Sequence, residues 1–258
     1  MERQSLLQPG SVDTTWQHGP CDPCHDDECL GAHLQIDAGI AHGLPEEVRT
    51  ELIKQSNIFW ASYSIPHIRM AMPHIRYRLG ELIGSYQRRY PQHVPVCKYD
   101  CVVHYRVGDF LEMPAACSGG NANDPPQNQT VPTYAVASAV ADAARPGAFI
   151  GIADGGSTHR VSCAARSAQS ISQLIQDLRS AGMTGRIETF HGDVDADFLI
   201  CARAPVLVTG PGSFAMMAAA ANARGVIRTP AAQNLNFPRT HGQREPEEIA
   251  PNWHTYSY

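Results

Sequence analysis

Three side chains able to do chemistry lie close together in the sequence CVVHYRVGDF, at residues 101–110: His104, Arg106 and Asp109. The apolar residues before them are typical of a buried β-strand, so the polar residues fall where that strand ends. An arginine guanidinium can bind two oxygens of one phosphate group at once. A histidine or carboxylate nearby can hydrogen-bond a ligand or move a proton. The stretch therefore predicts a phosphate-binding site at the end of a strand.

Polar and glycine residues also follow three further strand-like runs, in IADGGS, FHGD and TGPGSF. The side chains and glycine of these turns that could meet a ligand are Asp154, His191, Asp193, Gly212, Ser213 and Phe214. The last turn lets the backbone approach a ligand, and the helix predicted after it presents free N–H groups to a phosphate. The two aspartates could bind a ribose or a base, or could instead cap helices. No G-x-G-x-x-G turn follows the first strand, which argues against a dinucleotide-dependent dehydrogenase.

Strand-like and helix-like patterns alternate between residues 98 and 230. The five predicted strands lie at 99–105, 147–153, 185–190, 205–210 and 225–229. The four predicted helices between them lie at 133–144, 167–182, 195–203 and 213–224. Alternation of this kind predicts a parallel sheet with right-handed crossovers, and so an α/β fold with a Rossmann-like domain at 98–230. The carboxyl ends of its strands form the edge where ligands bind.

The flanking segments are less regular. Residues 1–97 are interpreted as a reduced N-terminal region with helices at 44–60 and 66–86, and residues 231–258 as a tail that packs back on this N-terminal half. The second helix contains the sequence PHIR twice. We expect its apolar residues to lie in the core and its arginines to be solvated. The core set is Ile68, Ile75 and Leu79, and the solvated set is Arg69 and Arg76.

The composition excludes several classes. The 258 residues carry a net charge of −5, which gives no reason to expect a nucleic-acid partner. No apolar run reaches the roughly 18 residues of a membrane span, and the N-terminus lacks the apolar core of a signal peptide. We therefore expect a soluble, cytoplasmic protein. The cluster Cys21, Cys24, His25 and Cys29 leaves zinc binding or redox regulation open as an alternative, although no second ligand pair of zinc-site spacing accompanies it.

The sequence also resembles a known family. VVHYRVGDF resembles the His-x-Arg-x-x-Asp motif of the fucosyltransferase superfamily, which includes alpha-1,2-, alpha-1,6- and protein O-fucosyltransferases. DADFLICARAPVLVTGPGSFAMMAAA resembles its pattern of an Asp-Phe pair, a strand and a Ser-Phe helix start, and VPTYAVASAV resembles its Pro-x-x-Tyr helix. The resemblance covers residues 98–230, with Val107 in place of the second arginine of the common motif.

The resemblance implies a GT-B-like glycosyltransferase in which this domain binds a nucleotide sugar. Arg106 would then bind the donor's β-phosphate, His104 would lie beside the nucleotide, and Ser213 would bind phosphate from its helix. The base that accepts the proton from the acceptor hydroxyl is expected to be Glu112 or Asp109. The expected partners are a nucleoside diphosphate sugar and a glycan acceptor, with no cofactor and no metal.

Together these features predict an inverting, metal-independent glycosyltransferase, with GDP-fucose as the donor that the resemblance favours. Another GDP- or UDP-linked sugar, such as a UDP-pentose, remains open. The alternative from another class is a non-catalytic nucleotide-sugar-binding protein on the same fold.

Overall fold

The computed structural model describes residues 66–107, 131–154, 164–190, 194–210, 213–231 and 250–257. The predicted helix at 44–60 and the cysteine cluster at 21–29 lie outside these residues. None of the helices in the described part of the chain is long and apolar enough to cross a membrane.

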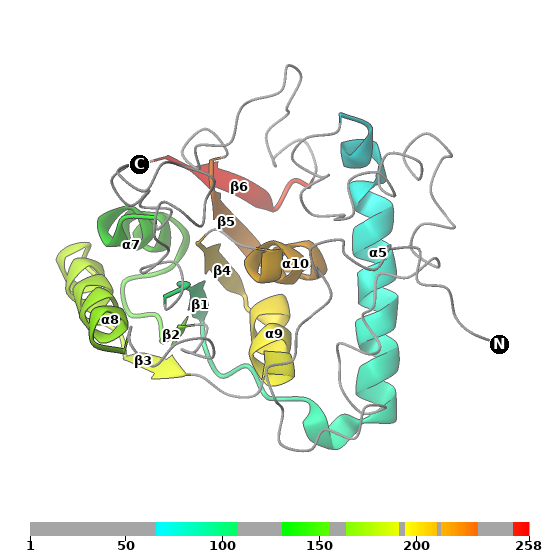
Figure 1. Cartoon of the computed structure of the whole chain (residues 1–258), viewed down its shortest axis with the longest axis horizontal. Helices are drawn as coiled ribbons and strands as arrows, with labels where there is room; N and C mark the ends of the chain where they lie inside the picture. The colour runs from blue at the N-terminus through cyan, green and yellow to red at the C-terminus, as the bar shows by residue number, and fades with distance from the viewer. Residues whose placement is uncertain are drawn as a thin grey trace, which may run out of the picture.

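A six-stranded, all-parallel sheet forms the centre of the described structure (Figure 1). Its strands are β1 (Cys101–His104), β2 (Ile150–Ala153), β3 (Ile187–Phe190), β4 (Val206–Thr209), β5 (Val226–Pro230) and β6 (Trp253–Tyr256). Their order across the sheet is β3-β2-β1-β4-β5-β6, the order of a doubly wound Rossmann sheet. The five strands predicted within 98–230 are confirmed. The sixth, which lies in the segment interpreted as a tail, was missed.

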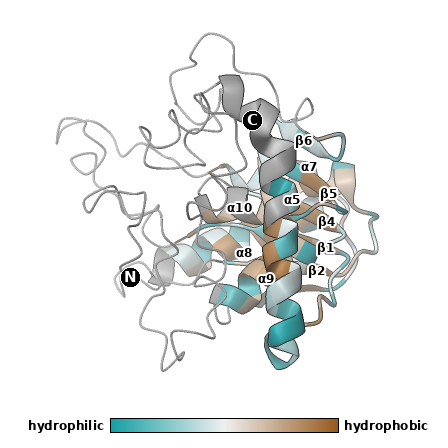
Figure 2. Ribbon diagram, turned by 90° about the vertical axis from the view of Figure 1, so that its right-hand side faces the viewer, coloured by the Kyte–Doolittle hydropathy of each residue, from teal (hydrophilic) through white to brown (hydrophobic). Residues whose placement is uncertain are grey.

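Helices cover both faces of the sheet (Figures 1 and 2). They are α5 (Pro66–Arg89), α7 (Thr133–Ala143), α8 (Ala164–Ser180), α9 (Val194–Arg203) and α10 (Ser213–Ala221), with a short 3-10 helix, η1, at Pro91–His93. On one face, α7 and α8 pack on the odd-numbered residues of β1, such as Val103. On the other face, α9 and α10 pack on Val102 and its neighbours, and α5 packs against α10 in the same cluster. Side chains of β1 and β4 are therefore buried on both faces, which explains why these strands are continuous apolar runs.

Helix α8 shows how closely periodicity predicts packing. Leu174 and Leu178 are fully buried, Ile171 is nearly so, and Ile175 packs partly buried against the same cluster. The chain then turns at Gly182, whose φ of 88° lies in the left-handed region. The amide of Met183 reaches back to the carbonyl of Leu178, which closes the helix end as expected.

Arg76 of α5 corrects the prediction that the arginines of this helix are solvated. Its side chain is buried, with 9% exposure, and Nη2 donates to the carbonyl oxygen of Asn222 at 2.9 Å and to Asn252 Oδ1 at 3.4 Å. The guanidinium lies 6.0 Å from the ring centroid of Trp253, and burial lowers the pKa of Arg76. Arg76 therefore ties α5 to the end of α10 and to β6. The core position of Leu79 is confirmed.

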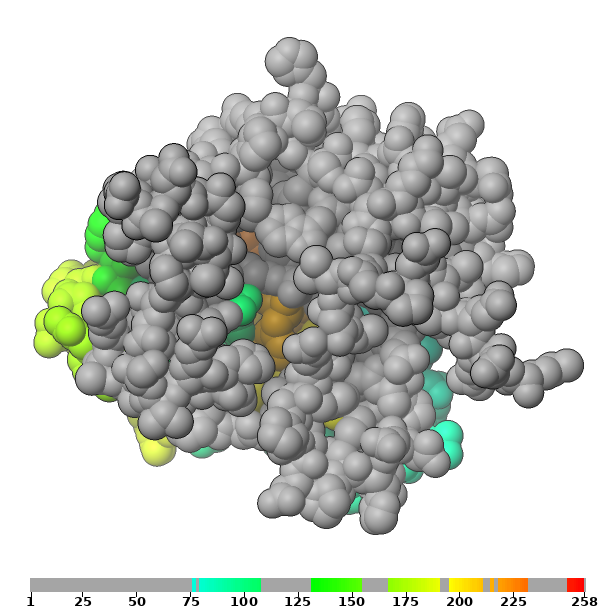
Figure 3. Space-filling view, viewed as in Figure 1, coloured from blue at the N-terminus to red at the C-terminus, as the bar shows by residue number. Residues whose placement is uncertain are grey.

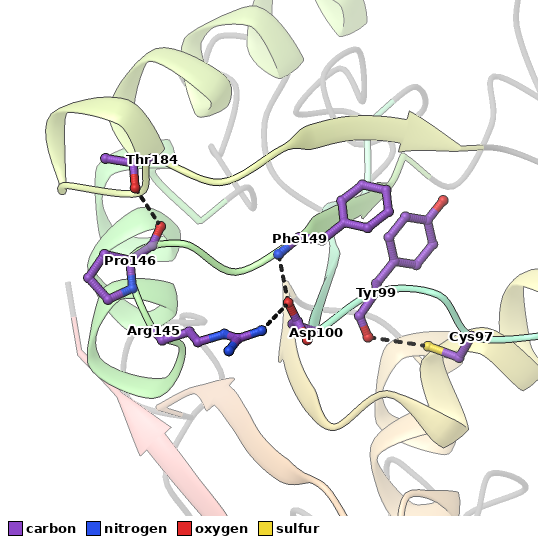
Figure 4. Close-up of polar contacts among 7 residues, drawn as sticks. All are labelled: Cys97, Tyr99, Asp100, Arg145, Pro146, Phe149 and Thr184. Atoms are coloured by element: carbon purple, nitrogen blue, oxygen red, sulfur yellow. Dashed lines mark hydrogen bonds and ion pairs between the residues drawn. The ribbon is translucent and has the colours of Figure 1, made fainter.

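The amino edge of the sheet is occupied by structural contacts (Figure 4). Asp100 Oδ2 accepts hydrogen bonds from the amide of Phe149 at 2.9 Å and from Arg145 at 3.2 Å, and these two bonds lower the pKa of Asp100. The ring of Tyr99 lies over Gly151, where an added Cβ would come within 2.8 Å of ring carbons. These contacts fix the starts of β1 and β2. Of the polar residues singled out by the sequence, His104 and Asp154 lie at the other edge, at the ends of β1 and β2.

Candidate functional site at the β1–β4 switch point

The candidate site lies outside the carboxyl ends of β1 and β4. The chain runs from β1 to β2 and β3 on one side and from β4 to β5 and β6 on the other, so the strand order reverses between β1 and β4. Parallel sheets of this kind bind ligands at such a switch point. His104 and Thr209, the last residues of β1 and β4, are register partners. The amide of Gly210 donates to the carbonyl of His104 at 2.8 Å, so the ladder continues one residue past β4.

His104 is held as a buried, neutral imidazole. Its ring is 3% exposed and stacks on Phe214 of α10, with centroids 4.9 Å apart and planes at 21°. Phe198 of α9 meets Phe214 edge-on at 5.8 Å. Burial, followed by the positive charge of Arg106, lowers the pKa of His104 to about 4. At neutral pH, His104 therefore carries one N–H donor and one nitrogen acceptor rather than a charge.

Thr209 lies on the same side of the sheet as His104, because register partners in a parallel pair point their side chains to one face. It is fully buried, and its Oγ1 has no hydrogen-bond partner. His104 Nδ1 is likewise buried without a partner. Among the described residues, four buried side-chain nitrogen or oxygen atoms lack partners, and two of them belong to the register pair His104–Thr209. Such atoms cost stability unless water or a ligand satisfies them.

Positive charge and helix geometry complete the site. Arg106 is half-buried two residues beyond His104, close enough for its charge to act on that imidazole. Helix α10 begins at Ser213, four residues after the end of β4, and directs its amino end to the carboxyl edge of the sheet. Figure 3 shows atoms of α10 beside atoms of the chain near the end of β1.

The structure brings several of the predicted site residues together. His104 and Phe214 are in contact, and Asp154 follows β2, where its carbonyl accepts from the amide of Val107 at 3.4 Å. Arg106 lies two residues after His104 and directly before Val107. The other predicted residues lie outside the described structure: Asp109, Glu112, His191, Asp193, Gly212 and the side chain of Ser213. In the part of the chain that the structure describes, no three His, Cys, Asp or Glu side chains form a metal-binding group.

Thr209 and Tyr256 were not among the site residues predicted from the sequence. Thr209 could have been found as the polar last residue of a strand that neighbours the His104 strand. The sequence around Tyr256 gives no such signal, because Tyr256 is near the site only through the pairing of β6 with β5. Its hydroxyl donates to the carbonyl oxygen of Thr209 at 2.8 Å.

The chain matches no family model, no curated protein and no solved structure. Fold and site together define its class as an α/β protein with a Rossmann-like parallel sheet.

Proposed function

We propose that the protein is a GT-B-like glycosyltransferase that binds a nucleoside diphosphate sugar at the β1–β4 switch point and transfers the sugar with inversion. GDP-fucose is the donor that the sequence motifs favour. The observation that carries the proposal is the rung formed by His104 and Thr209. Two buried polar atoms without partners lie there, beside Arg106 and near the start of α10.

This arrangement suits a diphosphate leaving group. The helix start offers free N–H groups and the positive end of the helix dipole, and the Arg106 guanidinium supplies a full charge. Both act in a partly buried site, where electrostatic stabilisation of a developing charge is strongest. His104, being neutral, can hydrogen-bond the donor without adding to this charge.

The proposed step is a single displacement. The acceptor hydroxyl oxygen forms a bond to the anomeric carbon of the sugar while the bond from that carbon to the diphosphate oxygen breaks. The electron pair of the broken bond stays on the diphosphate, and the hydroxyl proton passes to a carboxylate, with Glu112 the first candidate and Asp109 the second.

The test has two stages. Thermal unfolding is first measured with GDP, UDP and their sugar conjugates, since a ligand of the native state raises the melting temperature. Release of nucleoside diphosphate with and without glycan acceptors is then measured. Binding with turnover supports the transferase. Binding without hydrolysis or transfer favours the alternative, a non-catalytic nucleotide-sugar-binding protein. The absence of binding contradicts the proposal.

The substitution Thr209→Val is expected to have opposite effects on stability and binding. It removes a buried hydroxyl that has no partner in the free protein, so the melting temperature should stay level or rise. It also removes a group proposed to face the ligand, so nucleotide affinity should fall by about tenfold, the scale of one hydrogen bond. The measurements are thermal unfolding and calorimetric titration with GDP and UDP.

Thr229→Val is the matched control. Thr229 is also buried in the sheet, but its Oγ1 accepts a hydrogen bond from Trp253 Nε1 at 3.1 Å. Its replacement should cost about 1 kcal/mol of stability and leave nucleotide affinity unchanged. If both variants lose stability to the same extent and bind nucleotide normally, the Thr209 hydroxyl has no role in the site.

A further inference from the structure

The last strand of the sheet reaches across its neighbour to the candidate site. β6 pairs only with β5 among the described strands, with Trp253 opposite Ile227 and Tyr256 opposite Pro230. Trp253 is buried on the face covered by α5 and α10. Tyr256 packs on the opposite face, against the cluster formed with α7 and α8. From there its hydroxyl passes β5 and donates to the carbonyl oxygen of Thr209 in β4 at 2.8 Å.

This hydrogen bond stands where the ladder between β4 and β5 fails. The amide of Val226 donates to the carbonyl of Pro205 at 2.9 Å. Because donors recur at every second residue along a parallel strand, the amide of residue 230 would be the one to reach the carbonyl of Thr209. That residue is Pro230, which has no N–H. The Tyr256 hydroxyl supplies the missing donor.

The bond fixes one end of a single peptide group. The carbonyl of Thr209 and the amide of Gly210 belong to the same planar unit. Tyr256 holds the carbonyl, and the amide donates to the carbonyl of His104 at 2.8 Å. The unit is therefore pinned from both sides at the point where β4 ends and the turn TGPGS leads into α10.

We infer that Tyr256 is a positioning residue: it sets the plane of the Thr209–Gly210 peptide and thereby the direction in which the chain leaves β4, beside the proposed phosphate site. The inference rests on the proposed function for its consequence in binding, but the pinning itself is a property of the free protein. Tyr256 acts through Thr209, whose hydroxyl and carbonyl lie at the switch point.

The experiment compares Tyr256→Phe, Pro230→Ala and the double variant with the wild type. Tyr256→Phe keeps the ring and its packing but removes the donor. We expect exchange of the Gly210 amide to accelerate on the order of tenfold, the scale of one lost hydrogen bond. Affinity for GDP or UDP, whichever the wild type binds, should fall by about the same factor. In turnover, KM for the donor should rise while KM for the acceptor stays level.

Pro230→Ala restores the N–H that the ladder lacks, so the double variant should recover both slow Gly210 exchange and nucleotide affinity. A tyrosine that only filled space would not be rescued in this way. Trp253→Phe is the control on the same strand: it removes the hydrogen bond to Thr229, and should lower the melting temperature without changing Gly210 exchange or affinity.

The outcomes separate the two proposals. Unchanged Gly210 exchange in Tyr256→Phe, or accelerated exchange that Pro230→Ala does not restore, overturns the positioning role. A wild-type protein that binds neither GDP nor UDP contradicts the proposed function, while the exchange measurements still decide the role of Tyr256.

Discussion

Replacing Arg106 with alanine should reduce sugar transfer by ~100-fold or more, the scale of losing one group that stabilises charge in a transition state. The side chain follows β1 at the switch point, and its charge already acts on the neighbouring His104. In the proposed step, the diphosphate gains negative charge as the sugar leaves, and Arg106 is the cation that the sequence motifs assign to this charge. Initial rates at saturating acceptor, and the affinity for GDP and UDP, provide the measurement.

Two companion variants sharpen this test. Arg106→Lys should recover little activity, because an ammonium group cannot make the paired hydrogen bonds of a guanidinium. Arg145→Ala removes a cation at the opposite edge of the sheet, where Arg145 is 75% exposed and paired with Asp100 at 3.2 Å. Exposed pairs of this kind contribute little, so its activity should stay near that of the wild type. Near-normal transfer by Arg106→Ala would remove Arg106 from the mechanism.

The parts of the fold that sequence predicts well are those buried on both faces. β1, β2 and most of β4 are fully buried, and a strand in this environment must be a short apolar run between helices. β6 was not predicted because, among the described strands, it is an edge strand that pairs with β5 alone. Its residues WHTY mix polar and apolar types, so they do not form the apolar run of a strand buried on both faces.

Arg76 shows a second limit. The helical period correctly assigns Leu79 to the core, but it cannot reveal what lies opposite the remaining residues. Arg76 donates hydrogen bonds to the carbonyl of Asn222 and the amide oxygen of Asn252, which lie 146 and 176 residues away in the sequence. These distant acceptors and the ring of Trp253 offset part of the cost of burying the guanidinium.

The candidate site, like the fold, could be predicted from the sequence only in part. The motif around His104 and Arg106 was found because polar residues at a strand end stand out locally. The pairing of His104 with Thr209 depends on the register between β1 and β4, which are separated along the chain by β2 and β3. The role of Tyr256 depends further on a proline in the strand between.

Lowering the pH should destabilise the protein through His104. Its pKa is about 4 in the folded protein, where burial and then Arg106 oppose the charge, against about 6.5 for an unfolded histidine. Between these values the unfolded chain binds a proton that the native protein does not, so the free energy of unfolding falls as the pH falls. Above pH 6.5 the neutral His104 makes its full contribution to the free energy of unfolding. That free energy then falls by about 3 kcal/mol as the pH approaches 4.

The variant His104→Phe isolates this contribution. Phenylalanine keeps an aromatic ring for Phe214 to stack on but does not titrate. Urea unfolding at pH 7.5, 6, 5 and 4.5 should therefore show a smaller loss of stability for the variant than for the wild type, with the two curves parallel above pH 7. At pH 7.5 the variant should be at least as stable, since it also removes the unpartnered Nδ1. Equal losses in both proteins would mean that His104 is protonated as readily in the folded state as in the unfolded one. The assignment of a neutral imidazole to His104 would then be wrong.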